Sequence, residues 1–221
     1  LDNRIMYNRG EKNHGLAYAL NQGIHYASGE YIARMDDDDI AKSDRLAKQY
    51  HFLELHPQYQ WVGSSAELID RYGVWGLQTM PRIPQKRDFL FNSPYIHPSV
   101  MFRKKVLTDH HGYRISKKLL QCEDYELFMR LHQNGQRGYN LLEPLLQYRE
   151  DYESQKKKNY RRRIREMKVR YRGFYHLGIL NKTTFYYVFK PLFVGAIPAP
   201  LHHYLRRQLK RQKGKLSRET R

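Results

Sequence analysis

Apolar residues recur along positions 1–150 in two alternating patterns. Spacings of three or four residues predict helices at 14–27, 43–55 and 123–133, and residues 71–73 have the composition of a turn. Short apolar runs predict strands at 4–7, 31–35, 61–63, 66–69, 99–102 and 145–149. Strands that alternate with helices are typical of an α/β domain with a mainly parallel sheet flanked by helices.

The pattern changes after Ser154. A long basic helix is predicted at 156–172, and an apolar, aromatic run at 185–201 is interrupted by Lys190 and three prolines. A membrane-spanning helix needs about 20 apolar residues, so this run is too short and too broken to cross a bilayer. We therefore expect an α/β domain at 1–153 and a basic, aromatic-rich helical tail at 154–221.

The charge of the chain is concentrated in this tail. The chain has 221 residues and a net charge of +18, and the segment from Lys156 to Arg221 holds twenty Lys and Arg against two acids, whereas the acids and bases before it cancel. This division argues against a basic nucleic-acid-binding fold throughout the chain. It favours a balanced catalytic domain held at an anionic surface by its tail. Cys122 is the single cysteine, which excludes an internal disulfide and a Cys-based zinc site.

Four consecutive aspartates, Asp36 to Asp39, follow the predicted strand at 31–35. Ligands of open α/β sheets bind beyond the carboxyl ends of the strands, and adjacent carboxylates repel unless a cation neutralises them. Oxygen ligands alone favour Mg²⁺ or Mn²⁺. The alternative is a solvated acidic loop or helix start, because Asp39 precedes the predicted helix at 43–55.

A second acidic pair, Glu123 and Asp124, opens the predicted helix at 123–133. A carboxylate at a helix N-terminus can be held ionised and can act as a general base. The alternative is that both acids only cap the helix.

Short motifs in a fixed order connect these two acidic sites: Asn13-x-Gly15, Ala19-Leu20-Asn21-x-Gly23-Ile24, Ala27-x-Gly29-Glu30-Tyr31-Ile32-Ala33, Met35-Asp36-x-Asp38-Asp39, Arg45-Leu46, His97-Pro98-Ser99-Val100, Glu123-Asp124-Tyr125 and Tyr148-Arg149. In this order they resemble the inverting family 2 glycosyltransferases of GT-A fold. The resemblance covers most of residues 2–149. Members of this family begin with a strand, a helix and a strand that hold the nucleobase, and the resemblance implies that this chain lacks them.

The resemblance implies a role for each acidic site. Asp38 is the metal ligand of the Asp-x-Asp motif and binds Mn²⁺ or Mg²⁺, and Asp36 lies near the ribose of a nucleotide-diphosphate sugar or in the metal shell. Asp124 is the catalytic base, with Glu123 beside it. The implied reaction is a single displacement with inversion, in which the metal stabilises the departing nucleoside diphosphate.

Four further residues are candidates for the donor site. The motif that contains Asn13 and Gly15 places both among the donor-binding residues. His97 is expected to contact the diphosphate or to complete the metal shell, although a structural role is the alternative. Arg149 is expected to pair with phosphate, the alternative being a surface or carboxylate-paired arginine. Cys122 adjoins the Glu-Asp pair and is expected to be a packing residue.

The tail suggests where the protein works. Aromatic residues flanked by arginines suit the anionic headgroups of a membrane, although these aromatics could instead pack on the domain.

The expected function is sugar transfer to a glycan or lipid-linked acceptor in bacterial surface polysaccharide (lipopolysaccharide or capsule) synthesis, peripherally at the cytoplasmic face of the plasma membrane. The alternatives are a catalytically inactive fragment, or a nucleic-acid-binding protein that uses the tail. We expect no nucleic acid partner, because the second alternative leaves Asp36 to Asp39 unexplained.

Overall fold

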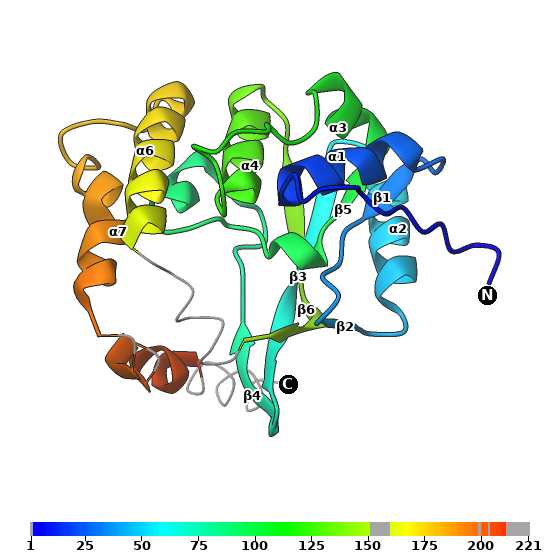
Figure 1. Cartoon of the computed structure of the whole chain (residues 1–221), viewed down its shortest axis with the longest axis horizontal. Coiled ribbons are helices and arrows are strands. Elements are labelled where there is room, and N and C mark those ends of the chain that lie inside the picture. Colours follow the sequence, from blue (N-terminus) through cyan, green and yellow to red (C-terminus); the bar gives the residue numbers. More distant parts are fainter. Residues whose placement is uncertain (1, 151–159, 199, 203, 211–221) are drawn as a thin grey trace.

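A mixed sheet forms the centre of the molecule (Figure 1). The computed structural model describes residues 2–150, 160–198, 200–202 and 204–210. The strands are β1 (Tyr31–Ala33), β2 (Ile40–Ala41), β3 (Trp61–Asp70), β4 (Gly73–Gln78), β5 (Met101–Arg103) and β6 (Gly138–Arg149). Their order in the sheet is β1-β5-β3-β6-β2, and β4 pairs with β3 as a hairpin.

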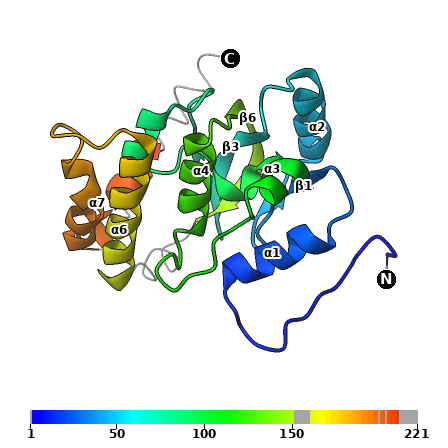
Figure 2. The same ribbon diagram turned by 90° about the horizontal axis from the view of Figure 1, so that it is seen from above.

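Helices cover both faces of this sheet. They are α1 (Leu16–Tyr26), α2 (Arg45–Leu55), α3 (Lys104–Asp109), α4 (Glu123–Gln133), α6 (Tyr160–Leu177) and α7 (Tyr186–Ala196), with the 3-10 helices η1 (Lys86–Leu90) and η2 (His97–Ser99). Successive side chains of a strand point to opposite faces. Trp61 of β3 accordingly packs on Phe128 of α4, whereas its neighbour Val62 packs with Leu53 of α2. The sheet thus lies between α4 and α2 (Figure 2).

The α/β class is as expected, but the expectation of a mainly parallel sheet is wrong. Among the described strands β3 and β6 form a parallel pair, while the pairs β1–β5, β3–β5, β3–β4 and β2–β6 are antiparallel. Strands β1, β3 and β6 do run in one direction. The three-residue strand β5 enters between β1 and β3 in the opposite direction, and an antiparallel neighbour does not need the crossover helix on which the prediction relied.

Other predicted elements differ from the structure in detail. Residues 4–7 form no strand, and the two strands predicted at 61–63 and 66–69 are one strand, β3. The pairing of β3 with β6 changes register at Ser64 and Ser65, where the prediction placed the break. The turn at 71–73 is confirmed, since Gly73 has a positive φ of 108° at the hairpin between β3 and β4. Helix α4 begins and ends where it was predicted.

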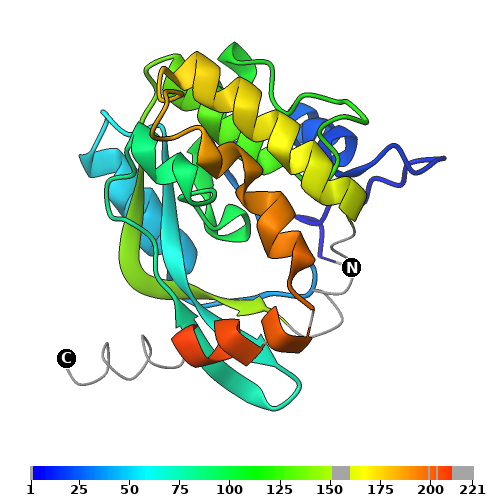
Figure 3. The same ribbon diagram turned by 90° about the vertical axis from the view of Figure 1, so that its left-hand side faces the viewer.

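Helix α6 lies along α4 and closes the main core (Figure 3). Its residues Val169, Phe174 and Leu177 are buried together with side chains of α4. Gly173 allows the close approach, because a Cβ atom there would lie 2.2 Å from the sulfur of Met129. The predicted helix at 156–172 therefore corresponds to α6, and its first residues, 156–159, lie outside the described residues.

The aromatic run at 185–201 forms α7 and a short continuation. Val188 and Pro191 are buried, whereas Phe189 is exposed over 36% and Phe193 over 71% of its surface. None of the helices in the described residues is both long and apolar enough to cross a membrane. The run thus packs on the domain through one side and leaves aromatic rings exposed on the other.

Candidate active site

The four aspartates lie in the short connection from β1 to β2. One carboxylate oxygen from each of Asp36, Asp38 and Asp39 lies within 4.8 Å of the other two, and we call these three residues the acidic cluster. Asp38 is exposed, Asp36 is half-buried and Asp39 is buried. Asp37 is exposed and lies outside the cluster.

Asp36 is paired with Arg34, an arginine that the sequence did not single out. The guanidinium of Arg34 donates two hydrogen bonds to this carboxylate, one of them 2.7 Å long. The backbone of Arg34 is anchored on both sides, because its N–H donates to the carbonyl of Val100 and its carbonyl accepts from the side chain of Arg45. Arg34 is itself buried, and its Nε has no partner among the described residues. The pair therefore places a buried positive charge beside the cluster.

Asp39 is held against the end of β6. Its Oδ1 accepts a hydrogen bond of 2.8 Å from the backbone N–H of Arg149, and the carbonyl of Asp38 accepts one of 2.9 Å from the Arg149 side chain. Burial, together with the charges of Asp36 and Asp38, raises the pKa of Asp39 to about 6 against the lowering effect of the Arg149 N–H. The other carboxylate oxygen, Oδ2, is buried without a hydrogen-bond partner in the described part of the chain.

These observations fit a divalent cation. Mg²⁺ prefers oxygen ligands at 2.0–2.1 Å, so that two oxygens bound to one ion lie at most about 4.2 Å apart, close to the spacing in the acidic cluster. The unpartnered Oδ2 of Asp39 would gain a partner, and an ion would offset the repulsion between the carboxylates. Asp38 and Asp39 are the residues best placed to hold it, because Asp36 is already paired with Arg34.

Glu123 and Asp124 form the first turn of α4, with Cys122 as the residue that precedes the helix. Glu123 is buried and Asp124 is half-buried. Burial raises the pKa of Asp124 and the neighbouring Glu123 raises it further, while the charges of Arg34 and Arg162 lower it. Arg34 therefore acts electrostatically on both the acidic cluster and the start of α4, which are more than 80 positions apart in the sequence. Cys122 is buried in the core, as expected of a packing residue.

His97 lies in η2 and is buried beside the site. Its Nε2 shares a hydrogen bond of 2.6 Å with the hydroxyl of Tyr113. Burial holds the pKa of His97 well below its usual range, and the charge of Arg34 acts in the same direction, so the imidazole is neutral. The loop that carries Tyr113 is fixed by Asn21 of α1, whose side-chain amide hydrogen-bonds to both the N–H and the carbonyl of Tyr113.

Asn13 and Gly15 start α1. The N–H of Gly15 donates to Oδ1 of Asn13 over 2.9 Å, and Gly15 has a positive φ of 88°, a conformation that favours glycine. The carbonyl of Gly15 accepts the N–H of Ala19 in the first turn of α1. The expected part of Asn13 and Gly15 in donor binding stays a prediction.

Comparison with known proteins identifies the family. The family described as Glycosyl transferase family 2 matches residues 1–119. The chain belongs to this family.

Curated relatives agree with the assignment to family 2. The putative glycosyltransferase EpsE of Bacillus subtilis is 33% identical over 95% of this chain and 76% of its own length. The O-antigen biosynthesis glycosyltransferase WbnJ of Escherichia coli is 33% identical over 67% of this chain and 58% of its own. UDP-Gal:alpha-D-GlcNAc-diphosphoundecaprenol beta-1,3-galactosyltransferase, also of E. coli, is 27% identical over 91% of this chain and 74% of its own.

A solved structure supports the fold. S. aureus TarS 1–349 in complex with UDP-GlcNAc superposes with a TM-score of 0.56 at 16% identity, covering 97% of this chain and 75% of that one. The GT-A-like α/β fold of this family 2 glycosyltransferase, with its helical C-terminal part, is thereby confirmed.

The structure brings most of the predicted site residues to one end of the sheet. Asp36, Asp38 and Arg149 meet there, and the charge of Arg34 reaches Asp124. His97 is not among the metal-ligating group that the described residues form, since its Nε2 faces Tyr113.

Arg34 and Tyr113 were not predicted from the sequence. Arg34 could have been found, because residues two apart in an extended segment share a face and Asp36 was already a candidate. Tyr113 carries no local signal, since it lies in a loop that Asn21 and Arg130 hold from two different helices.

Proposed function

We propose that this chain transfers a sugar from a nucleotide-diphosphate sugar to a glycan or lipid-linked acceptor with inversion. The observation that carries the proposal is the pairing of Arg34 with Asp36 of the acidic cluster, because the charge of the same arginine also lowers the pKa of Asp124 and so links a candidate metal site with a candidate base. The relatives and the TarS neighbour support a nucleotide-sugar donor through their names, which include UDP-Gal and UDP-GlcNAc.

In the proposed reaction Asp124 acts on the acceptor. Its carboxylate takes the proton of an acceptor hydroxyl, whose oxygen forms a bond to the anomeric carbon of the donor sugar. The bond from that carbon to the diphosphate oxygen breaks, and both of its electrons leave with the nucleoside diphosphate. The raised pKa of Asp124 suits this role, because a base with a higher pKa accepts the proton more readily.

The acidic cluster acts on the donor. Asp38 and Asp39 would hold Mn²⁺ or Mg²⁺, with Asp36 assisting if its pair with Arg34 opens. The ion, when bound, neutralises the charge that develops on the departing diphosphate. Arg149 orients the cluster through its bonds to Asp38 and Asp39, and its half-buried guanidinium is available to a phosphate at the rim.

The proposed setting is the synthesis of a bacterial surface polysaccharide, peripherally at the inner face of the plasma membrane. The names of WbnJ, an O-antigen enzyme, and of the galactosyltransferase that acts on a diphosphoundecaprenol-linked sugar support it. The exposed rings of Phe189 and Phe193 on α7 suit a contact with the membrane interface. The basic residues of the tail at 154–221 suit anionic headgroups.

Titration calorimetry on the full chain tests the metal and donor site. We expect Asp38→Ala to weaken Mn²⁺ and UDP binding by about a hundredfold, since loss of one carboxylate ligand of an ion costs about 3 kcal/mol of binding free energy. Asp37→Ala is the matched control, because it removes the same charge one position away from the cluster. Equal affinities of the Asp38→Ala and Asp37→Ala proteins would contradict the assignment.

A further inference from the structure

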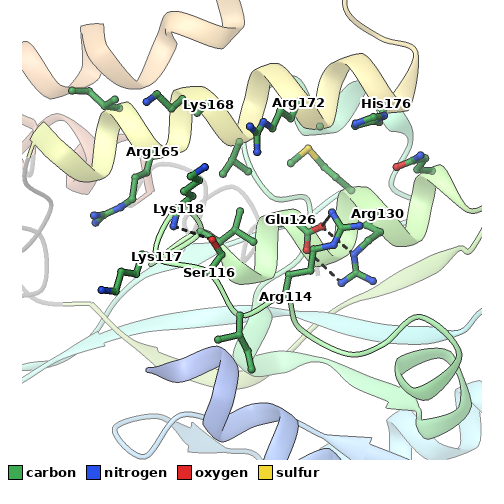
Figure 4. A pocket seen from close by; sticks show the side chains of 17 residues that line it. Arg114, Ser116, Lys117, Lys118, Glu126, Arg130, Arg165, Lys168, Arg172 and His176 are labelled. Atoms are coloured by element: carbon green, nitrogen blue, oxygen red, sulfur yellow. Dashed lines mark hydrogen bonds and ion pairs between the residues drawn. The ribbon is translucent and has the colours of Figure 1, made fainter. Parts of the chain in front are cut away.

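A groove of about 940 Å³ runs between α4, α6 and the loop that precedes α4 (Figure 4). Basic side chains come from all three walls. Arg165, Lys168, Arg172 and His176 follow one another along α6 at spacings of three or four residues, so they form one stripe on the face that lines the groove. His176 lies eleven positions after Arg165, so the stripe is about 16 Å long.

Most of the cations in the groove lack a carboxylate partner. Glu126 is the acidic residue in the lining, and it is bound at 3.0 Å by both Arg114 and Arg130. Among the residues that the structure describes, none of the remaining lining cations makes an ion pair: Lys117, Lys118, Arg165, Lys168 and Arg172. The Nε of Arg165 is in addition buried without a hydrogen-bond partner in the described part of the chain. Such a concentration of like charges in a cavity calls for an anion.

The groove also has apolar walls. Met129 and Val169 are buried in it, and Ile115, exposed over 59% of its surface, lies on the loop beside the cations. A site for inorganic phosphate alone would not need this surface. The combination suits a ligand that joins an anionic group to an apolar chain.

One end of the groove lies near the start of α4, the helix that carries the proposed catalytic base. Leu119, which lines the groove, lies four residues before Glu123, and Arg162, whose charge acts on Asp124, lies one helical turn before Arg165 on α6. Asp124 itself is not a lining residue, because residues two apart on a helix, such as Asp124 and Glu126, point to different sides. The labelled side chains of Lys117, Lys118 and Arg165 gather at one end of the groove, whereas the ion pairs of Glu126 lie toward the other, near Arg172 and His176 (Figure 4). The unpaired cations thus cluster at the end where α6 begins.

We propose that this groove binds the diphosphate of a lipid-linked sugar acceptor, between Arg165 on α6 and Lys117 and Lys118 on the loop. The inference rests on the proposed function, because it places the acceptor sugar at Asp124. In such an acceptor one sugar ring separates the diphosphate from the reacting hydroxyl, so the ring would pass the start of α4 to bring that hydroxyl to Asp124. The lipid chain lies along the apolar wall that includes Ile115.

Calorimetry with farnesyl diphosphate, a short water-soluble lipid diphosphate, tests the groove. UDP and Mn²⁺ are present at saturation, so that the donor site cannot take up the probe. We expect the double variant Lys117→Ala/Lys118→Ala, and separately Arg165→Gln, to lower the affinity by about tenfold or more. The control Lys12→Ala/Lys182→Ala removes two exposed lysines outside the groove and should leave the affinity unchanged.

The source of the affinity is tested with inorganic pyrophosphate and with vesicles of phosphatidylglycerol. Farnesyl diphosphate should bind at least about tenfold more tightly than pyrophosphate, because the groove also buries apolar surface. Phosphatidylglycerol vesicles that bind equally well to the groove variants and the unmutated protein also support a groove specific for diphosphate. Equal affinity for the two diphosphates would overturn the lipid part of the proposal.

Failure of the groove can be distinguished from failure of the proposed function. If UDP and Mn²⁺ bind in a manner that depends on Asp38, but farnesyl diphosphate binds all variants equally, the groove proposal is wrong and the transferase proposal stands. If UDP and Mn²⁺ binding does not depend on Asp38, the proposed function fails first, and with it the role of the groove in catalysis.

Discussion

Arg34 and Asp36, two residues apart at the end of β1, form an ion pair in which the guanidinium is buried and the carboxylate is half-exposed. The chain contains a second Arg–Asp pair of the same spacing, Asp2 and Arg4, whose side chains are both exposed. An exposed pair contributes little to stability, whereas a buried charge must keep its partner. Comparing the two pairs therefore measures how burial of the arginine changes the contribution of an ion pair to stability.

Arg34→Gln is expected to change the pH dependence of transfer. The charge of Arg34 lowers the pKa of Asp124, so its removal raises that pKa, and a larger share of the base is protonated at a given pH. The acid limb of a kcat/KM profile should therefore move to higher pH. Arg4→Gln is the control. An unshifted acid limb in Arg34→Gln would show that Arg34 does not act on the base.

Asp39→Asn is expected to stabilise the protein above pH 6 in the presence of a chelator. The pKa of Asp39 is raised from 3.8 to about 6, so the stability that the protonated carboxyl contributes is present at low pH and is lost as pH rises from about 4 to 6. Asn keeps the acceptor for the Arg149 N–H without the buried charge. The gain should be about 1–2 kcal/mol at pH 7.5 and near zero at pH 4, measured by urea unfolding. The Asp39→Asn substitution should also abolish the stabilisation that Mn²⁺ gives. If Mn²⁺ still stabilised the variant, Asp39 would be excluded as a metal ligand.

Asp124→Asn is expected to abolish transfer while UDP binding stays nearly unchanged, because a base acts on the acceptor and not on the diphosphate. Loss of a general base costs about a hundredfold to ten-thousandfold in kcat. Glu123→Gln should be milder, since Glu123 is buried beside the base and modulates its pKa. An Asp124→Asn enzyme with the turnover of the unmutated protein would contradict the proposed mechanism.

The double variant Phe189→Ser/Phe193→Ser is expected to weaken sedimentation with vesicles that contain phosphatidylglycerol. Inserting each ring into the interface contributes about 1 kcal/mol, so binding should fall by about thirtyfold when both rings are removed. Tyr7→Ser/Tyr72→Ser removes two exposed rings elsewhere and serves as the control. Binding of the unmutated protein should also weaken with salt, because salt screens the basic residues. Equal binding of both double variants would remove α7 from the membrane contact.

The elements predicted most accurately are those that depend on residues close together in the sequence. Helix α4 begins at Glu123 because acids favour a helix N-terminus, and its apolar residues recur at helical spacing. The acidic cluster was also predictable, since its residues are adjacent in the chain. Strand β5 was predicted, but its antiparallel direction was not. A strand of three residues holds no information on which neighbour it pairs with.

Features built from distant residues could not be predicted. The bond between His97 and Tyr113 depends on a loop that Asn21 holds from another helix, and neither residue carries a local signal for it. The groove likewise depends on the packing of α6 along α4. This packing was not predicted, because the segment after Ser154 is rich in basic residues. A highly charged helix suggests exposure, yet its few apolar residues complete the core.

The packing of α6 in the core has a consequence for how the chain folds. Ala17 near the start and Val169 near the end belong to the same buried cluster, so the main core closes a loop of about 150 residues. During synthesis β1, β3 and β5 leave the ribosome before α6, and the apolar surface of α4 stays open until α6 arrives. Contacts over such sequence separations slow folding and lengthen the exposure of aggregation-prone surface. Gene truncations that end before α6 should therefore yield insoluble protein, even though every residue of the acidic cluster and the base is retained.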